Sequence, residues 1–359
     1  MTYDEALTNC IFRYLSGSHA YGLNTEESDE DYRGVFIAPL NTAFDLFQTS
    51  FMGQGSIANL IKNAEKAIAI EDYTAAQEML RQAQEVDNGD LNFSVGTVRK
   101  INNDEELQEL RKFMKLAANC NPNIIEFLYI NDDDKTNQGK HLISHITPIW
   151  RQIRENRHMF LSKKARFTFS GYAIAQLKKI KAHRGYLLNP KGKPNRKDYK
   201  LPEKSLIPAE HQNALLSVPS EYASKKWKNV VLQEKRYRQC LNDFNSYKKW
   251  ETERNDKRKV LEAKCGYDAK HACHLIRLCR MAEEILRDGV VLVKRPDAQE
   301  LLNIRQGNVP YEAIIEIADA MDAKLDALYK TTTLRDKPDH KGIQKLYKNI
   351  CTEFYGINY

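Results

Sequence analysis

Several features that define other protein classes are missing from this chain of 359 residues. No run of about 18 or more apolar residues occurs, which excludes a membrane-spanning helix. Residues 1–15 (MTYDEALTNCIFRYL) carry acidic residues where a secretory signal carries basic ones. The seven cysteines are scattered and form no Cys-x-x-Cys pair, so a disulfide framework is not indicated. We therefore expect a cytoplasmic protein with reduced thiols and no membrane partner.

The two signs of charge are distributed unevenly along the chain. Residues 1–135 hold 11 basic and 23 acidic residues, a net charge of −12, whereas residues 136–359 hold 44 and 25, a net charge of +19. The composition, 42% hydrophobic and 29% charged, is that of a globular protein long enough for two domains. The charge split predicts a boundary near residue 135 and a second domain that binds a polyanion. Lysines that only solvate helix faces are the alternative explanation of each basic cluster.

The pattern of apolar residues predicts an α+β protein, with a mixed sheet and helices first and an α-helical domain after it. Aromatic and β-branched runs predict strands at 10–18, 32–38 and 91–101. Helical periodicity predicts a hairpin insertion at about 57–89, and an acid-rich first turn predicts a helix at 104–120. Beyond residue 135 we predict helices at 140–156, 159–183, 209–217, 220–255, 266–288, 297–306, 310–330 and 339–354. A loop rich in proline and lysine, at about 185–204, interrupts them.

Residues 15–35 (LSGSHAYGLNTEESDEDYRGV) place a small-residue turn and an acidic pair between two predicted strands. Gly17 lets backbone N–H groups approach a phosphate, and the Ser18 hydroxyl adds a donor. Asp29 and Asp31 project from one face if they begin the next strand. Neighbouring carboxylates repel each other, and a divalent cation relieves this. Their oxygen atoms suit Mg²⁺ (or Mn²⁺), which takes further ligands from substrate phosphates. Each motif alone is common in solvated loops, but together they predict a site for a nucleoside triphosphate (NTP) and a metal ion.

The segments GSHAYG (17–22) and SDEDYRGVF (28–36) resemble the DNA polymerase beta nucleotidyltransferase superfamily, and specifically its RNA-repair-pathway (RlaP-type) family. Further segments that resemble the family are 110–129, 169–180, 266–286 and 291–307. The resemblance implies a polymerase-beta-like catalytic domain at 1–135, which transfers a nucleotidyl group from an NTP to a hydroxyl acceptor, and a basic helical domain at 136–359. It also implies that Gly17 and Ser18 contact the triphosphate and that Asp29 and Asp31 bind the metal.

A third carboxylate usually completes such a site, as a metal ligand that helps to deprotonate the acceptor. Asp104 occupies the place that the resemblance implies, with Glu109 and Asp90 as alternatives. Asp104 is equally typical of an ordinary first-turn acid of a helix. The resemblance further implies that Lys270 and His271 line the cleft and meet a phosphate or the acceptor.

A zinc site is suggested at first sight by His271, Cys273 and His274, with Cys265 and Cys279 nearby. The spacing does not support it, because no cysteine pair is placed to complete a tetrahedron. The whole segment is instead typical of one amphipathic helix. We therefore predict no zinc at these residues.

Basic residues are densest between residues 178 and 200, where Tyr186 and Tyr199 interrupt them; this combination suits a nucleic-acid backbone with bases that can stack. The basic residues are Lys178, Lys179, Lys181, Arg184, Lys191, Lys193, Arg196, Lys197 and Lys200. The leading hypothesis is a Mg²⁺-dependent nucleotidyltransferase that acts on RNA in a repair or end-modification setting. One alternative is AMP transfer to a protein hydroxyl, as in antitoxin-like members of the superfamily. A catalytically silent nucleic-acid-binding protein is the other.

Overall fold

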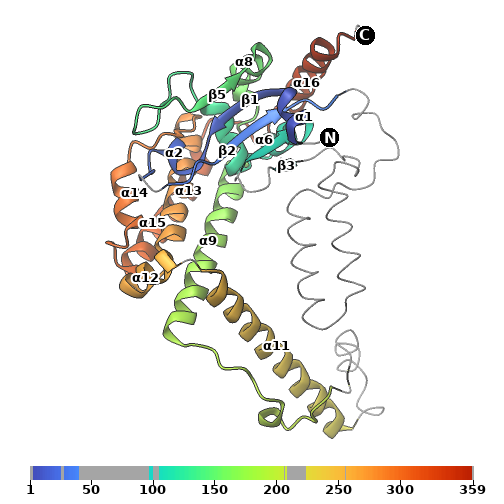
Figure 1. Ribbon diagram of the computed structural model, residues 1–359, viewed down its shortest axis with the longest axis vertical. Coiled ribbons are helices and arrows are strands. Elements are labelled where there is room, and N and C mark those ends of the chain that lie inside the picture. Colours follow the sequence, from blue (N-terminus) through green and yellow to red (C-terminus); the bar gives the residue numbers. More distant parts are fainter. Residues whose placement is uncertain are drawn as a thin grey trace. The chain divides into compact units, whose positions relative to one another are not determined.

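The computed structural model describes residues 3–25, 28–39, 97–99, 105–205, 207, 224–254 and 256–357 (Figure 1). These residues form a mixed α+β structure in which one sheet is accompanied by a mostly helical remainder. The predicted hairpin insertion at 57–89 and the predicted helix at 209–217 lie outside the described residues.

The sheet has five strands in the order β3-β4-β2-β1-β5. The strands are β1 (Cys10–Leu15), β2 (Tyr32–Phe36), β3 (Thr97–Arg99), β4 (Glu106–Glu109) and β5 (Ile143–Ile146). Strand β1 pairs antiparallel with β2 and β5, β4 pairs parallel with β2, and β3 pairs antiparallel with β4. The strands predicted at 10–18 and 32–38, which form β1 and β2, are therefore direct neighbours. The first prediction was wrong at its end, because β1 ends at Leu15 and Gly17–Tyr21 form the short helix α2.

Two predicted helices were wrong at their first residues. Residues 106–109 form β4, and the helix predicted from residue 104 begins only as α6 (Leu110–Ala118). Residues 143–146 form β5, and the helix predicted from residue 140 begins as α8 (Pro148–Glu155). In both places pairing with a strand distant in the sequence outweighs the local helical pattern.

An aromatic core packs against β1. The ring of Phe12 stacks on Trp150 of α8 at 4.2 Å, and the ring of Tyr14 meets Phe127 edge-on at 5.0 Å. Phe113 of α6 lies 5.2 Å from Trp150. All five side chains are fully buried, and each contributes about 1.5–3 kcal/mol through removal of apolar surface from water. This core fixes the sheet against the helices that follow it.

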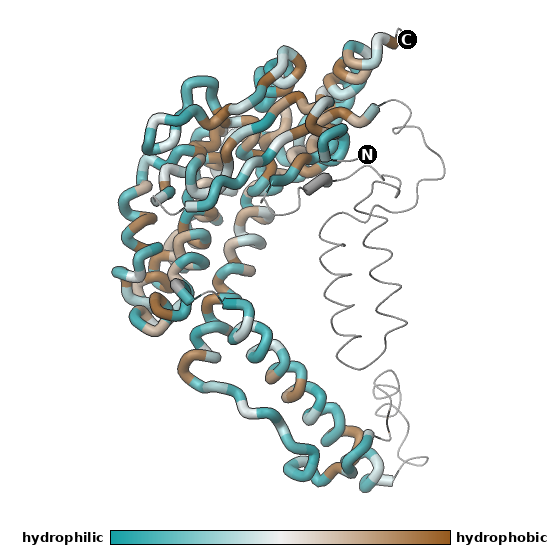
Figure 2. The backbone as a smooth tube through the Cα atoms, viewed as in Figure 1, coloured by the Kyte–Doolittle hydropathy of each residue, from teal (hydrophilic) through white to brown (hydrophobic). Residues whose placement is uncertain are grey.

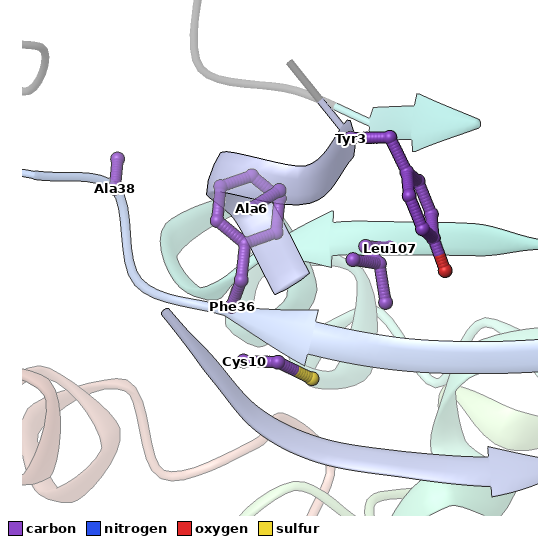
Figure 3. Close-up of a cluster of buried hydrophobic side chains, with 6 residues drawn as sticks. All are labelled: Tyr3, Ala6, Cys10, Phe36, Ala38 and Leu107. Atoms are coloured by element: carbon purple, nitrogen blue, oxygen red, sulfur yellow. The ribbon is translucent and has the colours of Figure 1, made fainter. Parts of the chain in front are cut away.

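A second buried cluster lies beside the N-terminal helix α1 (Tyr3–Thr8). Figure 3 shows its members, which are Tyr3, Ala6, Cys10, Phe36, Ala38 and Leu107. Because Cys10, Phe36 and Leu107 belong to β1, β2 and β4, the cluster ties helix α1 to the three central strands.

The remaining helical elements include most of those predicted beyond residue 135. They are α2 (Gly17–Tyr21), α7 (Pro122–Ile125), η1 (Glu126–Tyr129), η2 (Arg157–Met159), α9 (Ala165–Leu188), η3 (Arg196–Tyr199), α11 (Lys225–Glu253), α12 (Asp256–Cys265), α13 (Ala269–Asp288), α14 (Ala298–Arg305), α15 (Tyr311–Thr331) and α16 (His340–Tyr355). None of the described helices is long and apolar enough to span a bilayer.

The chain divides into two compact units made of interleaved segments. Unit 1 comprises Met1–Ile174, Cys273–Asn303 and Ile315–Tyr359, and unit 2 comprises Ala175–Ala272 and Ile304–Ile314. The sequence suggested one boundary near residue 135 between two functional domains, and that functional division stays a prediction.

Unit 2 contains the long helix α11, which is largely hydrophilic along its length (Figure 2). Its aromatic residues pack against the basic segment 178–200. The loop predicted at about 185–204 was wrong at its start, because α9 continues to Leu188, and η3 forms within it. The ring of Tyr186 lies 5.3 Å from Trp250, and the ring of Tyr199 lies 5.6 Å from Tyr237. Both tyrosines, which are half-buried, therefore pack against α11, and their predicted stacking on bases stays a prediction.

Candidate active site

The end of β1 lies directly against the acidic segment that precedes β2. Leu15 pairs with Tyr32 in the antiparallel ladder. One residue further, the Ser16 amide donates to the Asp31 carbonyl oxygen at 2.7 Å, and the Ser16 hydroxyl donates to the same oxygen at 3.0 Å. The Gly-Ser segment and the acidic segment are thus held together by the sheet that carries them (Figure 1).

The side chain of Asp31 lies beside Gly17. Its φ of +64° lies in the left-handed region that glycine adopts without strain. A Cβ added at this position would lie 3.1 Å from Asp31 Oδ2, so the carboxylate occupies the space that a side chain would need. The structure therefore brings together two of the predicted site residues, and Ser18 follows in the first turn of α2.

The three consecutive acids at 29–31 have different surroundings. Glu30 forms an ion pair with Lys140 at 2.6 Å and accepts a hydrogen bond from Tyr32 at 3.0 Å. The hydrogen bond from Lys140 lowers the pKa of Glu30. Asp29 is exposed, and Asp31 is half-buried against Gly17. The sequence suggested that Asp29 and Asp31 project from one face of the strand. Both residues precede β2, so strand alternation does not align their side chains.

His19 is a residue that the motif analysis did not select. Its side chain is 7% exposed, and its Nε2 lies 3.4 Å from the Ser28 carbonyl oxygen. Its buried Nδ1 has no hydrogen-bond partner among the described residues. A buried polar atom of this kind is costly unless a water or ligand pairs with it. The sequence could have pointed to His19 only through its position, because it directly follows Gly17-Ser18.

Helix α2 is supported from beneath by a buried ionic network. Tyr21, its last residue, donates to Glu126 at 2.8 Å, while the guanidinium of Arg277 lies 3.7 Å from the centre of the Tyr21 ring. Arg277 also lies 3.7 Å from Glu126 and donates to His274 Nδ1 at 2.9 Å. Burial raises the pKa of Glu126, against the effect of Arg277. These contacts fix the far end of α2 relative to α13.

The backbone carbonyl groups at the end of α2 accept two hydrogen bonds that hold the turn after it. Asn137 donates to the Gly22 carbonyl at 3.1 Å, and the Arg295 amide donates to the Tyr21 carbonyl at 3.1 Å. The Arg295 side chain is buried and paired with Glu284 at 2.7 Å. Arg295 therefore stabilises this part of the fold through its ion pair with Glu284.

The position of strand β4 argues against one candidate for the third carboxylate, Glu109. Its parallel pairing with β2 places Glu106 beside Arg33 and Glu109 beside Phe36. Glu109 lies three residues along the strand from Glu106, a distance of about 10 Å. Its carboxylate caps α6 by accepting from the Lys112 amide at 3.0 Å. Glu109 therefore caps α6 and lies at the end of β4 that is farther from Asp31.

Two other candidates for this role, Asp104 and Asp90, lie outside the described residues. Asp104 stays the predicted third carboxylate, with Asp90 as an alternative.

Lys270 and His271 lie at the start of α13 and belong to unit 2, whereas Gly17, Asp29 and Asp31 belong to unit 1. Lys270 is exposed, and His271 is half-buried beside Asp268. Their contact with a nucleotide stays a prediction.

Comparison with known proteins supports the family resemblance over the N-terminal part. Residues 3–65 match the model of the RlaP family, described as the RNA repair pathway DNA polymerase beta family. The chain is also 22% identical over 346 residues to an uncharacterized 38.9 kDa protein of the nrdC-mobD intergenic region of Enterobacteria phage T4, with 88% of each chain covered. No solved structure matches significantly. The matched segment contains Gly17, Ser18, Asp29 and Asp31, and the description of the matched family refers to RNA repair.

Proposed function

We propose that this protein is a Mg²⁺-dependent nucleotidyltransferase that transfers a nucleotidyl group from an NTP to a hydroxyl group of RNA. The observation that carries the proposal is the position of the Asp31 carboxylate, which fills the space beside Gly17 that a side chain there would need. It places a turn suited to phosphate beside a group suited to a metal ion, as a metal-bound triphosphate requires.

Each residue of the site has a defined part in this proposal. Gly17 and Ser18 contact the triphosphate, and Asp29 and Asp31, with Asp104, hold the metal through oxygen ligands. Bound Mg²⁺ supplies neutralisation of the charge that develops on the phosphoryl oxygens. The residues present fit the ion, because Glu30 is drawn away by Lys140 while Asp31 faces the Gly17 turn. The buried Nδ1 of His19 offers one further polar contact to the substrate.

RNA as the acceptor is supported by charge and by the family. Among the basic residues between 178 and 200, Arg196 pairs with Glu234 at 2.7 Å, and Arg184 lies over the Tyr311 ring. The lysines there are exposed and available to phosphates, namely Lys178, Lys179, Lys181, Lys191, Lys193, Lys197 and Lys200. The matched family carries RNA repair in its description.

The test uses each NTP labelled on its α-phosphate, Mg²⁺, and short RNAs with either a free or a blocked 3′ hydroxyl. We expect label in RNA with the parent protein, and a loss of at least about 100-fold for Asp29→Asn and Asp31→Asn. Glu30→Gln is the matched control, because it removes the neighbouring acid and only an exposed ion pair, and it retains activity.

Label in a protein band instead of RNA would identify AMP transfer to a protein. No transfer to any acceptor, or aspartate variants as active as the parent, would refute the proposal. DNA of the same sequence, tested in parallel, decides whether the acceptor must carry a 2′ hydroxyl.

A further inference from the structure

Three side chains that lie far apart in the sequence meet within unit 2. His183 belongs to α9, His271 to α13, and Asp268 immediately precedes α13. One ligand atom from each residue lies within 4.8 Å of those of the other two. His183 Nδ1 lies 3.4 Å and His271 Nε2 lies 3.5 Å from the same oxygen, Asp268 Oδ2.

These separations suit a shared metal ion better than direct hydrogen bonds. A well-formed N–H···O bond spans about 2.7–3.2 Å, which is shorter than either contact. Ligands bound at about 2.0–2.1 Å in a tetrahedron lie about 3.3 Å apart along each edge. Two imidazole nitrogens and a carboxylate oxygen form a ligand set that zinc and related transition metals accept.

The ligands are already oriented. The second carboxylate oxygen, Asp268 Oδ1, accepts the His271 amide at 3.0 Å, which fixes the carboxylate at the start of α13. The Trp250 ring lies 5.7 Å from the His183 ring and limits its rotation. Asp268 is 2% exposed, whereas the side chains of His183 and His271 are 19% and 18% exposed. Supporting contacts of this kind typically orient metal ligands, and the partial exposure leaves the set open to solvent.

We infer that His183, Asp268 and His271 form a binding site for a transition-metal dication, of which Zn²⁺ is the representative, with a fourth coordination position open to solvent. Two cations, Lys179 and Arg258, lie near His271. Because those two cations lie nearby, the open position favours an anionic oxygen ligand such as hydroxide or phosphate.

This site reverses the sequence prediction that no zinc binds at His271, because its other ligands, His183 and Asp268, were not among the residues considered there. It uses none of the cysteines near residues 265–279, and it makes His271 a metal ligand rather than a nucleotide contact. It is also independent of the proposed transferase activity, since binding is measured directly. Nitrogen ligands distinguish it from the oxygen ligands of Asp29 and Asp31, which suit Mg²⁺.

The test starts from the full chain stripped with a chelator and dialysed. We expect one Zn²⁺ per chain, not displaced by excess Mg²⁺. Co²⁺ bound in its place should show the visible bands of a four-coordinate site without a thiolate charge-transfer band. His183→Ala, His271→Ala and Asp268→Asn should each weaken binding by at least about 100-fold. Asp268→Asn is the most informative, because asparagine also caps helices and so preserves the start of α13.

His141→Ala, which removes an exposed histidine of unit 1, and Asp31→Asn should both bind Zn²⁺ as the parent does. Circular dichroism checks that each variant is folded, and the parent's Co²⁺ spectrum decides the ligand type if a variant is not. Absence of stoichiometric Zn²⁺, a thiolate band, or unchanged affinity in the three folded ligand variants would each overturn the inference.

Discussion

Gly17 and Asp31 are packed so closely that a methyl group on Gly17 would lie 3.1 Å from Asp31 Oδ2. The contact joins two motifs fourteen residues apart, and strands β1 and β2 enforce it through the pairing of Leu15 with Tyr32. A change at Gly17 is therefore a way to displace a carboxylate without removing it.

Gly17→Ala should reduce nucleotidyl transfer by about 100-fold, because the new methyl group displaces the Asp31 carboxylate. Its left-handed φ adds a backbone cost of about 1 kcal/mol. Gly139→Ala is the matched control: its φ is +83°, and its Cβ would meet nothing within 4 Å. Activity and urea unfolding of both variants separate the two effects, and equal activities would contradict a role for the contact.

Asp104 and Glu109 should give opposite results. Asp104→Asn should lower transfer by at least about 100-fold with little change in the free energy of unfolding, because its carboxylate serves the metal. Glu109→Ala should keep activity but cost about 1 kcal/mol of stability, because it removes the cap of α6. Steady-state rates and urea titrations measure both, and an active Asp104→Asn protein would exclude that residue.

Tyr21→Phe should loosen the support of α2. The Tyr21 hydroxyl donates to Glu126 at 2.8 Å, and loss of a hydrogen bond to a carboxylate costs about 1.5–3 kcal/mol. Tyr14→Phe is the control of identical chemistry, since its hydroxyl lies 3.4 Å from Glu126 and should cost less. Chemical unfolding tests the order, and KM for the NTP should rise in Tyr21→Phe alone. A larger loss of stability in Tyr14→Phe than in Tyr21→Phe would contradict the prediction that the Tyr21–Glu126 hydrogen bond is the stronger of the two.

Acid should weaken unit 2 through Glu234. Hydrogen bonds, first from Arg196 and then from Ser205 and Arg238, lower the pKa of Glu234 to about 2, although burial acts to raise it. A depressed carboxyl pKa adds stability that is full above the unfolded value of about 4.3 and disappears as pH falls toward 2. Glu234→Gln should therefore cost about 3 kcal/mol at pH 7, as loss of a buried partner does. The difference from the parent should shrink between pH 4 and pH 2, and thermal unfolding across this range measures it. A constant difference would argue against the ion pair as its source.

Much of the helical part and the neighbourhood of the candidate active site could be predicted from the sequence. Helices such as α15 and α16 carry their own periodicity, and β1 and β2 carry runs of aromatic and β-branched residues. Strand β4 was missed because its sequence, ELQE, is polar. Its buried Gln108 is satisfied by Thr97 of β3, a partner that no local pattern reveals.

The sequence by itself determined the components of this protein: a Gly-Ser turn, an Asp-x-Asp segment and the strands between which they lie. Local chemistry suffices for these, because backbone preference and apolar periodicity act over a few residues. Only the tertiary structure decided that Asp31 rather than Glu30 faces Gly17, that Glu109 caps a helix, and that His183 meets Asp268 across 85 residues. Those outcomes depend on which side chains the packed strands and helices bring within a few ångströms, and spacing along the chain does not encode that.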